Sequence, residues 1–199
     1  GSEMCIRDRA SLKRVLYLDP DILVINPLRP LWDLDLQGNV FAAASHIGVV
    51  DVMNGINRIR LKTEQDYYNS GVMLMDLEAA RVLVQPEAIF QYVRDHENEL
   101  LLPDQDVFNS LYGAQTLQID DALWNYDARY YSGYLLRSGG AYHMDWVMQH
   151  TAILHFCGKR KPWKRSYATR FAPLYKHYRQ LAARSGASFV SLSAPPSHG

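Results

Sequence analysis

The sequence has few cysteines and no long apolar run. Its only cysteines are Cys5 and Cys157, which excludes a disulfide-rich scaffold, supplies no zinc-binding spacing and is typical of a reducing compartment. No apolar run reaches the roughly 18 residues of a membrane span. Repeats and low-complexity tracts are absent as well. What remains is ordinary: 199 residues, 48% of them hydrophobic and 21% charged, indicate one globular domain.

Acidic residues are missing from the last quarter of the chain. No Asp or Glu follows Asp145, whereas residues 146–199 contain nine Lys and Arg and so balance at +9. Residues 1–145 hold all 21 acids and the other 12 bases, a balance of −9. This split indicates that the C-terminal part meets something anionic, although a solvated basic face explains it equally well.

Apolar runs predict buried strands at residues 14–19, 39–45 and 71–77, and shorter strands at 116–120 and 151–156. The first run does not alternate with polar residues, so it predicts a parallel strand that is covered on both faces. Helical patterns occupy residues 78–83, 86–102, 102–113 after an initial loop, and 170–186. The alternation of strands and helices predicts an α/β fold with ligands at the carboxyl ends of the strands.

Two carboxylates stand directly after the first strand, because Asp19 and Asp21 flank Pro20. An ionised carboxylate is not buried alone, so the pair must face a cation, hydrogen-bond donors or solvent. Pro20 excludes the helical region for Asp19 and stiffens the pair. Two such oxygen donors suit Mg²⁺ or Mn²⁺, whose remaining positions a substrate phosphate can fill. A plain turn is the alternative, because Asp and Pro are turn residues.

Three further motifs carry polar groups. In LHFCGKRKPWK, residues 154–164, His155 ends a strand, Gly158 allows close backbone approach, and four bases follow. If His155 lies beside the carboxylates, its imidazole favours Mn²⁺ as the bound ion. A lysine of this motif can neutralise the charge on a leaving phosphate. The alternative is that His155 is a core histidine with no role in binding. LPDQDVFN contains Asp104 and Gln105, with helix capping by Asp104 as the alternative. Asn69-Ser70-Gly71 precedes a strand, and a simple turn explains it equally well.

In this order, the four motifs resemble those of the retaining glycosyltransferases of family 8, which include glycogenin and bacterial lipopolysaccharide galactosyl- and glucosyltransferases. YLDPDILV is similar to the Asp-x-Asp strand of that family, and NSGVMLMDL to its Asn-(small)-Gly strand. LPDQDVFN is similar to its Asp-Gln segment, and LHFCGKRKPW to its His-x-x-Gly-x-x-Lys-Pro-Trp motif. The resemblance covers residues 12–180.

The resemblance implies an α/β fold of the GT-A (Rossmann-like) type, a mixed and mostly parallel sheet flanked by helices. It implies metal-dependent transfer of glucose or galactose from a UDP-sugar to a saccharide or lipid-linked acceptor, with retained configuration. The family's site residues match the following positions here: Asp19, Asp21 and His155 as ligands of Mn²⁺ (or Mg²⁺); Gly158 and Lys161 as diphosphate contacts; Asn69, Asp104 and Gln105 beside the donor sugar. Gln105 would lie nearest the anomeric carbon, and Asp104 is the less favoured catalytic candidate.

The resemblance also implies a missing part. In the family, several βα units precede the Asp-x-Asp strand and hold the uracil, whereas here only residues 1–9 and Ala10 to Lys13 precede it. We interpret residues 1–9 as a cloning or sequencing scar and residues 10–164 as a partial catalytic domain without its N-terminal βα units. We therefore expect an exposed edge strand and a fragment that is inactive alone.

Residues 165–185 are expected to form a basic and aromatic helix, and residues 186–199 a disordered tail. Such a helix fits an anionic membrane surface, where a lipid-linked acceptor would lie, although packing on the catalytic domain is the alternative. The expected location is therefore cytoplasmic or peripheral on the inner membrane face, with no nucleic acid partner.

Two other functions compete with this interpretation. Phosphatases of the haloacid dehalogenase type also place Asp-x-Asp after an apolar strand and would use Asp19 as the nucleophile. They usually carry Thr or Val where this chain has Leu23, and they give no role to HFCGKRKPW. The second alternative is a non-catalytic remnant that binds a sugar or a partner.

Overall fold

The computed structural model describes residues 11–45, 61 and 65–185. The chain divides into two compact units, residues 1–157 and residues 158–199. The first unit contains all the strands of the described residues and the helices up to residue 150. The second contains α10, Ala172–Arg184, as its one helix within those residues. No helix in the described part is long and apolar enough to cross a membrane.

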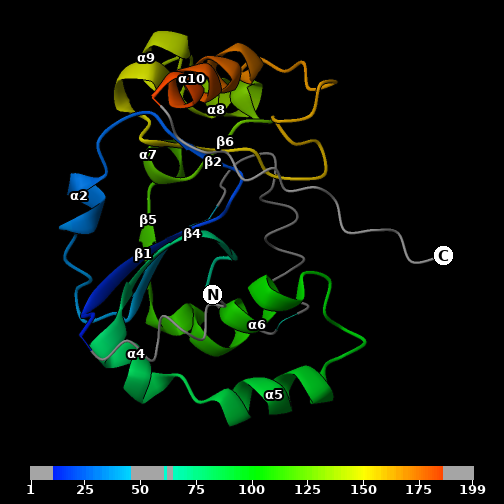
Figure 1. Cartoon of the computed structure of the whole chain (residues 1–199). Helices are drawn as coiled ribbons and strands as arrows, with labels where there is room; N and C mark the ends of the chain where they lie inside the picture. The colour runs from blue at the N-terminus through cyan, green and yellow to red at the C-terminus, as the bar shows by residue number, and fades with distance from the viewer. Residues whose placement is uncertain (1–10, 46–60, 62–64, 186–199) are drawn as a thin grey trace. The chain divides into compact units, whose positions relative to one another are not determined.

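A four-stranded sheet forms the centre of the first unit, in the order β1-β4-β3-β5 (Figure 1). Its strands are β1 (Arg14–Leu18), β4 (Tyr68–Asp76), β3 (Phe41–Ser45) and β5 (Thr116–Ile119). β1 and β3 both pair antiparallel with β4, and β3 pairs parallel with β5. The mixed sheet agrees with the GT-A prediction, but the expected parallel direction of residues 14–19 was wrong.

The two faces of this sheet explain that error. Val72 and Leu74 of β4 lie in one buried apolar cluster, and their neighbour Met73 lies in a second cluster on the opposite face. Helices α4, α5 and α6 contribute side chains to the second cluster and lie on the same side of the sheet (Figure 1). A strand covered on both faces has a continuous apolar sequence whatever its direction, so sequence pattern cannot distinguish the two pairings.

A smaller sheet lies beside the first, in the order β2-β7-β6. Its strands are β2 (Ile22–Val24), β7 (Ile153–His155) and β6 (Tyr126–Asp127). β2 pairs antiparallel with β7, and β6 pairs parallel with it. The helices of the first unit are α2 (Arg29–Trp32), α4 (Leu77–Leu83), α5 (Pro86–Asp95), α6 (Pro103–Tyr112), α7 (Asp121–Trp124), α8 (Tyr131–Arg137) and α9 (Met144–His150), with a 3-10 turn at Gly113–Gln115.

Helix α6 begins earlier than the sequence predicts. It starts at Pro103, so Asp104 and Gln105 lie in its first turn rather than in a loop, and Asp104 is not the capping residue. Buried Asp106 instead accepts hydrogen bonds from the backbone N–H groups of Leu101 (2.7 Å) and Leu102 (3.0 Å). Asp106 thus holds the two N–H groups just before the helix. Helix α5 ends at Asp95 and does not continue to residue 102 as expected.

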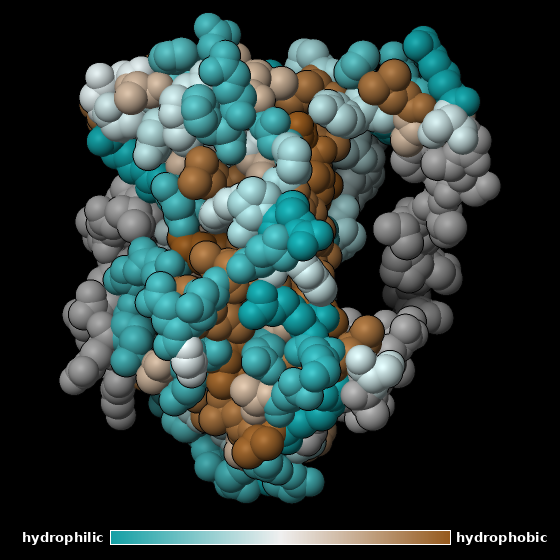
Figure 2. All heavy atoms as spheres, turned by 90° about the vertical axis from the view of Figure 1, so that its left-hand side faces the viewer, coloured by the Kyte–Doolittle hydropathy of each residue, from teal (hydrophilic) through white to brown (hydrophobic). Residues whose placement is uncertain are grey.

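β1 is an edge strand in the described part of the chain. It pairs only with β4 there, and all five of its residues are half-buried. Leu12, which lies just before this strand, is 36% exposed, and Trp32 in α2 is 39% exposed. Figure 2 views the side that carries α2 and shows a band of apolar residues at its surface. Within the described residues, the edge position agrees with the expectation for residues 14–19, whereas no residue of β1 itself is exposed.

We expect the Phe41→Ala variant to lose about 3–5 kcal/mol of the free energy of unfolding. Phe41 is 4% exposed and packs edge-on against Phe108, with ring centroids 5.3 Å apart. Phe90→Ala is the matched control, because Phe90 is 58% exposed and its truncation should cost less than about 0.5 kcal/mol. Urea unfolding followed by circular dichroism measures both, and equal losses would show that Phe41 is not a core residue.

Candidate metal centre

The chain crosses from the larger sheet to the smaller one at Asp19-Pro20-Asp21. The backbone N–H of Asp19 donates to the carbonyl of Gly71 at 2.8 Å, which extends the pairing of β1 with β4. The carbonyl of Asp21 accepts from the N–H of Phe156 at 2.9 Å, which extends the pairing of β2 with β7. The two carboxylates are therefore held by different sheets, on either side of a stiff proline.

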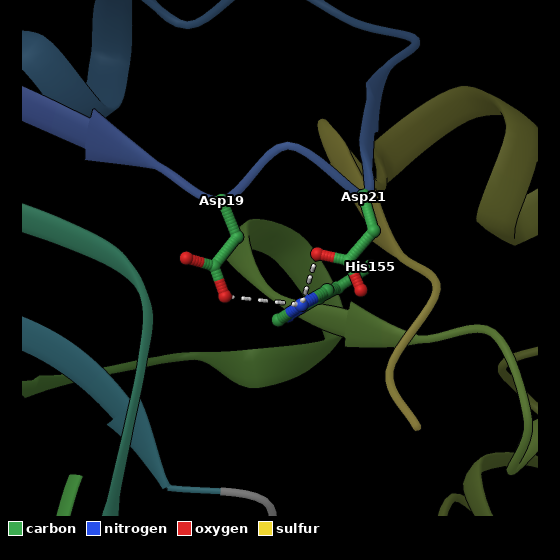
Figure 3. Close-up of side chains that lie close together, drawn as sticks. All are labelled: Asp19, Asp21 and His155. Atoms are coloured by element: carbon green, nitrogen blue, oxygen red, sulfur yellow. Dashed lines mark ion pairs between the residues drawn. The ribbon is translucent and has the colours of Figure 1, made fainter. Parts of the chain in front are cut away.

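His155, the last residue of β7, completes a cluster with these two aspartates (Figure 3). Its Nε2 lies 3.7 Å from Asp19 Oδ2 and 3.4 Å from Asp21 Oδ1. One ligand atom from each of the three residues lies within 4.8 Å of the others. His155 and Asp21 are buried, at 3% and 6% exposure, whereas Asp19 is half-buried. The structure thus brings together the three side chains that the sequence suggested as metal ligands.

The donor atoms fit a divalent cation. Adjacent ligands of an octahedral ion that binds at about 2.1 Å lie about 3 Å apart, so these side chains need only small movements to share one ion. Two carboxylates beside an imidazole also concentrate negative charge at a largely buried place, which a divalent cation would offset. Two oxygen ligands and one nitrogen ligand are a set that Mn²⁺ accepts readily.

Gly71 in β4 lies directly against this cluster. A Cβ at this position would lie 2.3 Å from His155 Cε1, 2.8 Å from Asp19 Oδ2 and 3.0 Å from Asn69 Oδ1. Only glycine therefore allows the backbone of β4 to pass so close to the three groups. The sequence motif contains Gly71, but nothing in the pattern assigns it this role, since the contact depends on a residue more than 80 positions away.

A row of hydrogen bonds leads from His155 to the candidate donor-sugar residues. His155 Nδ1 lies 2.9 Å from Asn125 Oδ1, and Asn125 Nδ2 donates to Asn69 Oδ1, also at 2.9 Å. Asn69 Nδ2 then donates to Gln105 Oε1 at 3.3 Å. Asn125 is fully buried and was not identified from the sequence. Its one sequence signal is its place between Trp124 and Tyr126, because an asparagine among large aromatics needs buried partners.

The strand beside His155 carries a partly buried ion pair. Asp127 of β6 is paired with His155 in register and binds Arg129, with 2.6 Å between Asp127 Oδ2 and Arg129 Nη2. This hydrogen bond raises the pKa of Arg129. Nearby, Tyr134 donates to buried Asp121 at 2.9 Å. Burial, with the charge of Asp121 as a further cause, raises the pKa of Tyr134 well above its usual value, so this phenol stays a donor.

The other candidates of the sequence analysis lie elsewhere. Asp104 is exposed in the first turn of α6, and within the described residues no hydrogen bond or ion pair joins it to the cluster. Gly158 and Lys161 belong to the second unit. Gly158 has φ of +84°, a left-handed conformation that glycine adopts without strain, so the glycine of this motif is required by the backbone itself.

We expect Gly71→Ala to weaken Mn²⁺ binding at least about tenfold, because the added methyl displaces His155 or Asp19. Gly113→Ala is the matched control, since a Cβ there meets no atom within 4 Å. Electron paramagnetic resonance of free Mn²⁺ gives both affinities in the absence of nucleotide. Equal affinity in the two variants would contradict the close packing around Gly71.

The sequence of the chain matches a known protein family and several known proteins. Residues 6–166 match the family model described as glycosyl transferase family 8. General stress protein A of Bacillus subtilis (strain 168) is 30% identical over 174 residues, 84% of this chain and 59% of that protein. Lipopolysaccharide 1,2-glucosyltransferase of Escherichia coli (strain K12) is 27% identical over 177 residues, 85% of this chain and 48% of that protein.

A crystal structure of the galactosyltransferase LgtC, in complex with donor and acceptor sugar analogues, superposes with a TM-score of 0.70 and 26% identity. The match covers 94% of this chain and 64% of LgtC. The chain thus spans about half to two thirds of the length of these three proteins. The comparisons give no support to the haloacid dehalogenase alternative. The chain belongs to glycosyl transferase family 8.

Proposed function

We propose that the protein is a metal-dependent retaining glycosyltransferase that moves glucose or galactose from a UDP-sugar to a saccharide or lipid-linked acceptor. The observation that carries the proposal is the convergence of Asp19, Asp21 and His155 from two sheets onto one small volume. Membership of family 8 supports it, as does the similarity to a galactosyltransferase whose structure holds donor and acceptor sugar analogues.

In this proposal, the three residues would hold Mn²⁺ or Mg²⁺, which would bind the donor through its diphosphate. The bound ion supplies positive charge that stabilises the departing UDP. Gly158 and Lys161 are the proposed protein contacts of the diphosphate, the first through its backbone and the second through its ammonium group. The left-handed backbone of Gly158 is consistent with a tight turn around a phosphate.

Asn69 and Gln105 are the proposed contacts of the donor sugar, and their hydrogen bond keeps them together. Gln105 is an amide and cannot act as a carboxylate nucleophile. We therefore favour attack by the acceptor on the face from which UDP leaves, through an oxocarbenium-like state. Asp104 is the less favoured nucleophile, since it is exposed in the first turn of α6 and has no contact with the cluster among the described residues.

We expect Asp21→Asn to lower Mn²⁺-dependent release of UDP from UDP-glucose or UDP-galactose by at least about 100-fold, since even groups behind the ligands cost 10–100-fold when removed. Asp33→Asn is the matched control, because Asp33 is an exposed residue that pairs with Arg29. The assay compares the 199-residue chain with the product of the complete reading frame, before and after chelation.

Release of UDP that survives both chelation and the Asp21→Asn change would overturn the metal-dependent mechanism. Hydrolysis of p-nitrophenyl phosphate that disappears with Asp19→Asn would instead support the phosphatase alternative. A chain that binds UDP-sugar without turnover in either length of protein would support the non-catalytic alternative.

The basic C-terminal region is proposed to attach the enzyme to an anionic membrane surface from the cytoplasmic side. Lys176, Arg179 and Arg184 of α10 are exposed, and Tyr175 and Tyr178 on the same helix are half-buried. The absence of acids after Asp145 leaves these charges without intervening negative side chains in the sequence. Each base near such a surface contributes roughly 1 kcal/mol.

We expect the double variant Lys176→Gln, Arg179→Gln to bind vesicles that contain anionic lipid about 30-fold more weakly, since it loses two cations of this kind. The double variant Lys13→Gln, Arg94→Gln removes the same charge from exposed positions of the first unit and serves as the control. Sedimentation with anionic and with neutral vesicles measures the effect. Equal binding by the two variants would contradict attachment through α10.

A further inference from the structure

We propose that Asn125 is a positioning residue that holds His155 in the tautomer with its proton on Nδ1 and, through Asn69, couples the metal centre to Gln105. The catalytic consequence rests on the proposed function. The tautomer itself is a property of the protein without metal or nucleotide, so it can be tested separately.

The direction of every hydrogen bond in this row follows from one backbone group. The N–H of Gly71 can only donate, and it lies 3.0 Å from Asn69 Oδ1, so that atom is the accepting oxygen of the Asn69 amide. The same oxygen faces the side-chain amide of Asn125 at 2.9 Å and must accept there too. Asn125 therefore presents its NH₂ group to Asn69, which leaves its oxygen facing His155.

The orientation of Asn125 then decides the state of His155. Asn125 Oδ1 lies 2.9 Å from His155 Nδ1 and can only accept, so Nδ1 carries the proton. With the opposite amide orientation, the oxygens of buried Asn125 and half-buried Asn69 would face each other, and the hydrogen bond between these two amides would be lost. The lone pair of His155 Nε2 is consequently directed at the two aspartates, which is the arrangement that a metal ligand needs.

This restraint acts against the local electrostatics. Asp19 Oδ2 and Asp21 Oδ1 lie 3.7 Å and 3.4 Å from Nε2, and both carboxylates favour a proton on that nitrogen. A proton there would occupy the position of the cation. Because Asn125 offers an acceptor to Nδ1 and nothing to Nε2, it favours the tautomer that leaves Nε2 open for the ion.

The other end of the row reaches the donor-sugar residues. Asn69 Nδ2 donates to Gln105 Oε1, so the Gln105 side chain is oriented by the same row of amides. The backbone of Gln105 is held independently, since its carbonyl accepts from Asn109 Nδ2 at 2.8 Å and Asn109 also bonds the backbone of Tyr68 in β4. A change at Asn125 should therefore reorient the Gln105 side chain without moving helix α6.

The tautomer is read directly by long-range ¹H–¹⁵N NMR of the histidine-labelled full chain, without metal, at pH about 8.5 where ordinary imidazoles are neutral. His155→Gln identifies the His155 signals by their loss. We expect Nδ1 to show the shift of a protonated ring nitrogen and Nε2 that of an unprotonated one. A proton on Nε2 in the wild-type protein overturns the proposal without any variant of Asn125.

Two substitutions separate positioning from a merely structural role. In Asn125→Asp, the carboxylate still accepts from His155 Nδ1 but cannot donate to Asn69, whereas Asn125→Leu loses both contacts. We expect Asn125→Asp to keep the tautomer and an Mn²⁺ affinity at least equal to wild type, while UDP-sugar turnover falls. We expect Asn125→Leu to lose the tautomer preference and to bind Mn²⁺ about 10–100-fold more weakly.

Circular dichroism confirms that each variant is folded before its Mn²⁺ affinity is measured. If Asn125→Leu does not fold, the wild-type tautomer and Asn125→Asp decide the question. Mn²⁺ affinity equal to wild type in folded Asn125→Leu, or parallel loss of metal affinity and turnover in Asn125→Asp, overturns the proposal. If neither the 199-residue chain nor the product of the complete reading frame transfers sugar, the proposed function fails, while the tautomer and the metal affinities still test the role of Asn125.

Discussion

The candidate site depends on how the chain leaves one sheet and enters another. The N–H of Asp19 donates to Gly71 in β4, and the carbonyl of Asp21 accepts from the N–H of Phe156, the residue after β7. Pro20 between them has no N–H that would need a partner. The distance between the two carboxylates is therefore set by the packing of the sheets rather than by side-chain rotamers alone, and any shift between the sheets changes the geometry of the ligands.

One apolar cluster stabilises the packing of the two sheets against each other. Val72 and Leu74 come from the larger sheet and Ile153 from the smaller one, and all three are completely buried in the same cluster. Two close carboxylates destabilise a fold unless a cation or hydrogen bonds offset their charge. The buried contacts across the sheets oppose this repulsion, and the hydroxyl of Tyr17, which donates to Asp19 Oδ1 at 2.9 Å, reduces it locally.

The strands of the larger sheet, β7 and the three candidate ligands could be predicted from the sequence, because apolar runs mark these strands and each ligand ends or borders such a run. β2 and β6 were not predicted, since they are only three and two residues long. The direction of β1 could not, because clusters on both faces of the sheet remove the alternation that distinguishes antiparallel strands. Helices α7, α8 and α9 are four to seven residues long, too short for a clear helical period. Asn125 and Gly71 act through contacts with distant residues, which no local pattern reveals.

The hydrogen bonds of Asn69 restrict what this residue can offer to any bound molecule. Its oxygen already accepts from two N–H groups, those of Gly71 and Asn125, and one hydrogen of its NH₂ group is directed at Gln105. Among the contacts of the described residues, a single N–H is left over. Toward a bound pyranose, Asn69 can thus act only as a hydrogen-bond donor. Its remaining N–H can donate to a ring or hydroxyl oxygen, but Asn69 cannot accept a hydrogen bond from a sugar hydroxyl.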